Sequence, residues 1–140
     1  MSPLLQILLG LFLNLVTLAI HLTLVTLSLQ TIKARLSIVR DRGGTLAKMA
    51  FILLSVLILS LAVLLEAAIW AATFVSTNAV ESFKEGIYFA IVTLTTLGYG
   101  DIAPSKGAQL LAALCALAGL FVMGLSTAFI VEILRRLEAD

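Results

Sequence analysis

Three long apolar stretches separated by polar segments dominate the pattern of the chain. They cover residues 3–31, 49–75 and 107–134. A helix needs about 20 consecutive apolar residues to cross the core of a bilayer, and each stretch is longer than this. The pattern therefore predicts an all-α membrane protein with three transmembrane helices.

The polar segment between the first two stretches is strongly basic. It also holds a glycine pair at residues 43–44, which predicts a loop between helices. Its charged residues are Lys33, Arg35, Arg40, Asp41, Arg42 and Lys48. Cytoplasmic loops carry the excess of lysine and arginine, so we expect this segment, and Arg135-Arg136 after the third stretch, to be cytoplasmic. The N-terminus and the segment between the second and third stretches would then be extracellular, in a multi-pass protein of the plasma membrane.

Composition excludes several other classes of protein. Hydrophobic residues make up 61% of the chain and charged residues 12%, against about half and a quarter in soluble proteins. The net charge of +1 indicates neither nucleic acid nor an acidic partner. The single cysteine, Cys115, excludes an intrachain disulfide and is expected to pack in the core. No set of acid, base and nucleophile indicates an enzyme, and no cofactor is expected.

The segment between the second and third stretches contains a distinctive motif. Ser82-x-x-Glu85 predicts a capped short helix over 83–95, and a run of nine residues overlaps its end: Thr93-Leu94-Thr95-Thr96-Leu97-Gly98-Tyr99-Gly100-Asp101. Glycines at 98 and 100 supply left-handed torsions, which a backbone needs if its successive carbonyls are to face one way. An ordinary turn is the alternative, but the length of the run and its place between two spanning stretches disfavour it.

This run resembles the signature of potassium-channel pore loops. The resemblance implies a re-entrant pore helix and a selectivity-filter loop between the second and third transmembrane helices, assembled as a homotetramer in lipid. It also implies that K⁺, the permeant ion, is bound by carbonyls of the filter residues Thr96, Leu97, Gly98, Tyr99 and Gly100 and by the Thr96 hydroxyl. Residues in positions that support the filter are Thr93, Thr95, Asp101, Tyr88 and Phe89.

The third stretch continues the resemblance, since residues 114–119 are similar to the inner helix of voltage-gated potassium channels. Gly119 then takes the position of a gating hinge, or serves only for close packing of helices. Pore-lining positions implied after it, at steps of four, are Met123, Thr127 and Val131. We expect an N-terminal helix with its basic loop over 1–47 and a pore domain over 48–140.

Two departures from the family pattern keep alternatives open. Tyr88 and Phe89 stand where relatives often have tryptophans, and Phe89 cannot donate a hydrogen bond to Tyr99. Val92 replaces an acid found in some relatives, so that acid cannot pair with Asp101. Besides a passive K⁺-selective channel, the alternatives are a weakly selective cation channel and a non-conducting accessory or scaffold subunit.

Polar residues inside the first two stretches are the remaining signal. Gly10, Asn14, Thr17, His21 and Ser28 share one seam of the first helix, which should face protein. Glu66 lies inside the second stretch and needs a partner, because a lone charge in a bilayer is costly. His21, Tyr88 or a pore-helix threonine could serve. The predicted helix boundaries separate His21 from Glu66 by about 10 Å in depth, which argues against direct contact.

The aromatic residues of the second stretch carry one further expectation. Trp70 and Phe74 lie near its extracellular end. Tryptophan is enriched where a helix leaves the bilayer, because its ring suits the interface between lipid and water. We therefore expect both side chains to lie in an aromatic belt facing the lipid headgroups.

Overall fold

The computed structural model describes residues 1–42 and 44–138, and for residues 29, 31–38 and 40–42 it describes the backbone alone. The described chain is built from helices: α1 (Pro3–Arg42), α2 (Thr45–Ser76), α3 (Phe83–Leu94) and α4 (Gln109–Glu138). Three of them are long and apolar enough to cross a membrane. The prediction of an all-α protein with three such helices is confirmed.

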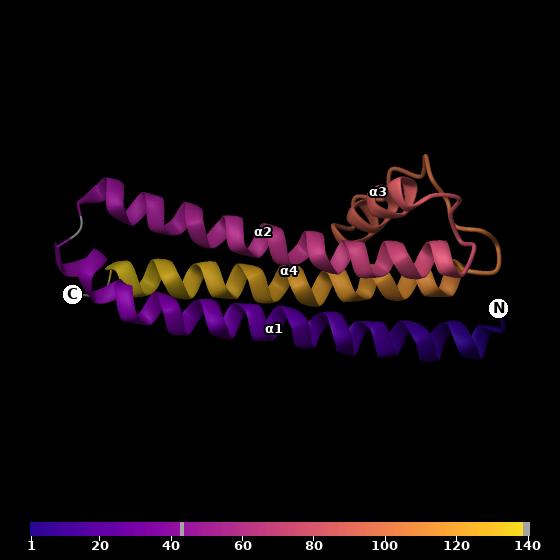
Figure 1. Ribbon diagram of the computed structural model, residues 1–140, viewed down its shortest axis with the longest axis horizontal. Coiled ribbons are helices and arrows are strands. Elements are labelled where there is room, and N and C mark those ends of the chain that lie inside the picture. Colours follow the sequence, from indigo (N-terminus) through magenta and orange to yellow (C-terminus); the bar gives the residue numbers. More distant parts are fainter. Residues whose placement is uncertain (43, 139–140) are drawn as a thin grey trace.

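The three long helices run side by side, and α3 lies beside one end of α2 (Figure 1). The N-terminus is at the same end of the bundle as α3, which we call the α3 end. The connection between α1 and α2 and the end of α4 lie at the opposite end. Helix α2 has 32 residues and α4 has 30, or about 48 and 45 Å of helix, which exceeds a bilayer core of about 30 Å.

Helix α1 is longer than predicted, and the expectation of a loop from residue 32 onward is wrong. The helix continues through the basic segment to Arg42. Residues 32–42 contain neither glycine nor proline, and leucine, lysine and arginine are good helix formers. The charges of these residues determine whether the helix lies in lipid or in water, and they do not prevent the backbone from being helical. Gly43 lies outside the described residues, and Gly44 is the extended N-cap residue of α2.

The core at the α3 end is aromatic. Trp70 and Phe74 of α2 are fully buried. The rings of Phe74 and of Phe89 of α3 pack edge to face, with centroids 5.0 Å apart. The predicted aromatic belt is therefore wrong for these two residues, because α3 and α4 cover this face of α2. Cys115 of α4 is buried in the same cluster, as predicted.

The polar seam of α1 faces protein, as predicted. Gly10, Thr17 and His21 are buried, while Asn14 and Ser28 are half-buried. Gly10 lies so close to Leu114 of α4 that an added Cβ would overlap the leucine side chain. Small residues of this kind let helices approach closely in a membrane. The seam therefore fixes α1 against α4.

Candidate functional site

Helix α3 begins at a capped turn. The Ser82 hydroxyl accepts a hydrogen bond from the Glu85 amide at 3.3 Å, as the motif predicts. The Glu85 carboxylate accepts from the amide of Glu81, also at 3.3 Å, whereas in a capping box it accepts from the amide of the N-cap residue. Gly86 then lets α3 approach α2, since an added Cβ would lie 3.1 Å from the carbonyl oxygen of Ala71. The cap and this contact set where the end of α3 points.

The signature segment, residues 93–101, leaves the end of α3 with an alternating backbone. Thr96, Gly98 and Gly100 have φ angles of 58°, 54° and 79°. The two glycines were predicted to be left-handed, whereas Thr96 was not. A side chain in this region costs about 1–2 kcal/mol, so the fold must hold Thr96 there. Left-handed torsions at every second residue are the geometry that turns successive carbonyls toward one side.

Hydrogen bonds to the last turn of α3 anchor the start of this segment. The amides of Leu97 and Gly98 donate to the carbonyl of Val92 at 3.0 and 3.2 Å, and the amide of Thr96 donates to Thr93 at 3.0 Å. The Thr95 hydroxyl bonds back to Ile91 at 2.8 Å. The later residues of the segment, 97–101, are exposed, and Tyr99 is 68% exposed.

The far end of the segment is held by Tyr88. Its hydroxyl donates to Asp101 Oδ2 at 2.7 Å. The bond lowers the pKa of the Asp101 carboxyl and raises the pKa of the Tyr88 phenol. Phe89, predicted as a second support, is 8% exposed and packs in the core. Sequence reasoning missed that Tyr88 supplies the polar contact to Asp101 that Val92 cannot make.

Comparison with known proteins identifies the family. The sequence model of the ion-channel family matches residues 51–136, which is more than half of the chain. The chain belongs to this family. Human potassium voltage-gated channel subfamily A member 7 is 42% identical over 52 residues, covering 36% of this chain and 11% of the relative. Mouse subfamily A member 10 is 40% identical over 52 residues, with 36% and 10% covered.

Human subfamily A member 4 is 37% identical over 57 residues, which cover 40% of this chain and 9% of the relative. The chain thus spans about a tenth of the length of these relatives. No solved structure gives a significant match. Together the matches support a potassium-channel pore-domain family, whose members are channels and not enzymes.

In this chain, Gly119 of α4 lies directly against the end of α3. An added Cβ would overlap the Leu94 carbonyl group, and Gly119 is buried. The close-packing interpretation of Gly119 is therefore confirmed, while its hinge role stays a prediction. Of the other positions on the predicted stripe, Met123 is half-buried, and Thr127 and Val131 are exposed in the single chain.

A cluster of charged residues lies at the C-terminal end of α4, away from the α3 end of the bundle. Glu132 accepts hydrogen bonds from Arg135 Nε at 3.0 Å and from Arg136 Nε at 2.5 Å. Lys48 of α2 donates to the carbonyl of Leu137 at 3.3 Å, where a cation complements the negative end of the helix dipole. The last turn of α4 is thus tied to the first turn of α2.

His21 and Glu66 are in direct contact, and the prediction against this is wrong. His21 Nδ1 lies 2.9 Å from Glu66 Oε1, and both side chains are fully buried. His21 lies 21 residues before the end of α1, and Glu66 lies 21 residues after the start of α2. The antiparallel helices therefore place them at one level. The predicted offset arose because both helix ends were placed too far from the connection.

Ser126 of α4 completes the network. Its hydroxyl lies 3.2 Å from His21 Nε2, so a serine, a histidine and a glutamate from three helices form one chain of contacts, which we call the three-helix network. The order is that of a hydrolase triad, but the imidazole and the carboxylate are sealed between spanning helices, where a substrate has no access. Sequence reasoning missed Ser126, because only the fold brings it to His21.

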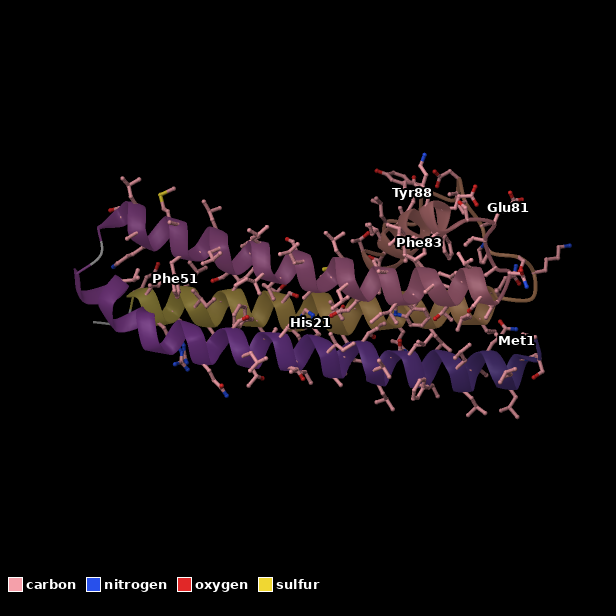
Figure 2. All side chains as sticks on the ribbon, in the orientation of Figure 1. Met1, His21, Phe51, Glu81, Phe83 and Tyr88 are labelled. Atoms are coloured by element: carbon pink, nitrogen blue, oxygen red, sulfur yellow. The ribbon has the colours of Figure 1, made fainter. Side chains whose placement is uncertain are left out.

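An acidic hollow lies beside the end of the signature segment. It has a volume of about 640 Å³, and its lining includes Glu81, Glu85 and Asp101. Figure 2 shows Glu81 and Tyr88 at the outer edge of this region, away from the long helices. Negative side chains around a hollow raise the local concentration of cations. The α3 end of the bundle is thus electrostatically suited to cations.

Proposed function

We propose that the chain conducts K⁺ passively and selectively across the plasma membrane, with residues 96–100 as the selectivity filter. The observation that supports this best is the left-handed alternation at Thr96, Gly98 and Gly100. The carbonyls of residues 96–99 and the Thr96 hydroxyl would replace the water shell of the ion. K⁺ is the permeant ion and needs no further cofactor.

The geometry of an ion ring supports the proposal of a homotetramer. One chain presents a single line of carbonyls and cannot surround an ion, while Leu97 and Tyr99 stay 54% and 68% exposed. Helix α3 has 12 residues, about 18 Å, and cannot cross a bilayer. We therefore place it as a re-entrant pore helix whose negative C-terminal end faces the axis, where it favours a cation.

The inner helix of this pore is α4. Gly119 packs against α3, and in the proposed tetramer Met123, Thr127 and Val131 face the axis. Val131 forms a constriction near the cytoplasmic end that closes by dewetting. The Glu132 carboxylate holds the guanidinium of Arg135, which supports a position of that charge away from the axis. The predicted division at residues 47 and 48 would separate this pore from α1.

We propose that the α3 end is extracellular, with the basic residues of α1 and α4 in the cytoplasm. The N-terminus then lies outside. A cysteine at Ser2 should react with an impermeant reagent in intact cells, while one at Thr45 should react only after permeabilisation. Cys115 is fully buried and provides the unreactive background. The reverse pattern would contradict the orientation.

Conduction itself is tested by K⁺ flux from vesicles. Purified protein in K⁺-loaded liposomes should release K⁺ down its gradient with a rate proportional to the protein added, and an ionophore that clamps the potential should speed the release. Release that matches empty liposomes would instead favour the accessory-subunit alternative. The Tyr88–Asp101 bond supports a braced filter over the weakly selective alternative.

A further inference from the structure

The three-helix network lies outside the filter and is not used by the proposed conduction. Glu66, His21 and Ser126 each come from a different spanning helix, and the contacts run through both nitrogens of one imidazole. Figure 2 shows His21 midway along the bundle, between α1 and α4. A side chain placed in this way connects the helix outside the family motif to the inner helix.

The network can take up a proton at one defined atom. With Nδ1–H donated to the Glu66 carboxylate, His21 Nε2 is either bare, accepting from the Ser126 hydroxyl, or protonated, donating to the Ser126 oxygen. Protonation makes the pair neutral overall, which a membrane interior favours over a lone carboxylate. Glu66 Oε2 has no hydrogen-bond partner among the described residues, so His21 is the group that compensates this acid.

No other charge among the described residues competes for this position. Helix α2 carries Lys48 besides Glu66, and Lys48 is bound at the opposite end of the bundle. On α4 the nearest charges are Glu132 and the arginines paired with it. Residues 3–32 of α1 contain no acidic or basic side chain other than His21. The state of the network therefore depends on His21 and Glu66 alone.

Ser126 gives the network a route to water and to the pore. It is half-buried, and its neighbour Thr127 is exposed and lies on the stripe proposed to face the axis. Water in the cavity could exchange a proton with His21 Nε2 through the Ser126 hydroxyl. The same hydroxyl changes from hydrogen-bond donor to acceptor when the proton binds. The contact between His21 of α1 and Ser126 of the inner helix therefore changes with protonation.

We propose that Glu66, His21 and Ser126 form an intramembrane proton-binding site that controls the inner helix, so that the opening of the pore depends on the protonation of His21. The control rests on the proposed function, whereas proton binding does not. His21 of α1 connects α4 to α2 through these contacts, and the strength of that connection depends on whether His21 is protonated.

The first test is the protonation of the imidazole. The chain has one histidine, so nitrogen NMR of histidine-labelled protein in nanodiscs, with any affinity tag removed, reports His21 alone. Over a titration from alkaline to acid pH, Nδ1 should stay protonated while Nε2 changes from bare to protonated. Ser126→Ala should shift the Nε2 resonance most, and Glu66→Gln the Nδ1 resonance. An imidazole unchanged over this range would overturn the proposal.

The second test is gating. Open probability in single-channel records should change about fivefold or more between pH 5 and pH 8. His21→Gln should make it independent of pH, and Ser126→Ala should weaken the dependence. Thr17→Val and Ser55→Ala are matched controls, since these buried hydroxyls bond to their own helices, and both should keep the wild-type profile.

The outcomes separate the two claims. If K⁺ current is seen but its open probability does not change with pH, or if the pH dependence is the same in His21→Gln, the control of the inner helix is overturned. The proposed function is unaffected by either result. No K⁺ current at any pH would contradict the proposed function, and with it the control. In that case the NMR titration still decides whether the proton site exists.

Discussion

The signature segment and the three-helix network are two polar regions of one apolar bundle, and they are built in opposite ways. The segment is contiguous in sequence, holds unusual torsions and leaves Tyr99 exposed. The network joins residues 45 and 105 positions apart and hides His21 and Glu66 completely. In the proposed tetramer the first needs the segments of other chains, whereas the second lies within one chain. Substitutions should therefore affect conduction in one region and the fold of the chain in the other.

The largest expected effect is that of Gly98→Ala. Space is available for the added methyl, since nothing lies within 4 Å of an ideal Cβ. The cost is the left-handed torsion, about 1–2 kcal/mol in each of four proposed subunits, which should abolish selective K⁺ conduction without unfolding the helices. Current recordings and helix content measured by circular dichroism check both parts.

Gly44→Ala is the matched control for this substitution. Gly44 also has open space around it, but its φ is −68°, which alanine adopts readily. Its channels should conduct normally. Normal selectivity in Gly98→Ala channels would show that the left-handed torsion is dispensable.

The second effect concerns the fold. His21→Leu leaves Glu66 buried without its partner, which should destabilise the protein by about 3 kcal/mol. Glu66→Leu leaves a neutral imidazole and should cost less. The double variant should be more stable than His21→Leu alone, because the orphaned acid is gone. Unfolding in detergent, compared with Thr17→Val, measures the series; strictly additive losses would refute the coupling.

A smaller effect is expected from Tyr88→Phe, which removes the bond to Asp101 and keeps the ring. That bond lowers the pKa of Asp101, so its contribution is present above the ordinary pKa of an aspartate and is lost as pH falls through the lowered value. Without the tyrosine hydroxyl, the pKa of Asp101 should rise. Loss of current on external acidification should then occur at a higher pH than in wild type. If the midpoint pH of this loss is unchanged, the Tyr88–Asp101 hydrogen bond has no role in conduction.

The smallest effect is expected at the acidic hollow. Glu81→Gln should reduce K⁺ conductance modestly in about 0.1 M salt, where surface charges act over about 10 Å, and leave it unchanged in about 1 M salt, where they act over about 3 Å. Conductance measured at both salt concentrations gives the comparison. An equal loss at both would indicate a structural effect instead of an electrostatic one.

The same contrast explains what the sequence could predict. Helix α3, its Ser82 cap and the left-handed glycines depend on neighbouring residues, and local patterns predicted them. The Glu66–His21–Ser126 contacts depend on where α1 ends, and the basic segment was interpreted as a loop although it is helical. Burial of Trp70 and Phe74 likewise depends on how α3 packs on α2, which no local pattern contains.

The central claim is selective K⁺ conduction through the signature segment, and reversal potentials of purified channels in a bilayer test it most directly. With K⁺ on one side and Na⁺ on the other, each tenfold permeability ratio displaces the reversal potential by about 59 mV. We predict a displacement well beyond this value in the direction of K⁺, lost in Gly98→Ala. A reversal potential near zero in the wild type would contradict the claim.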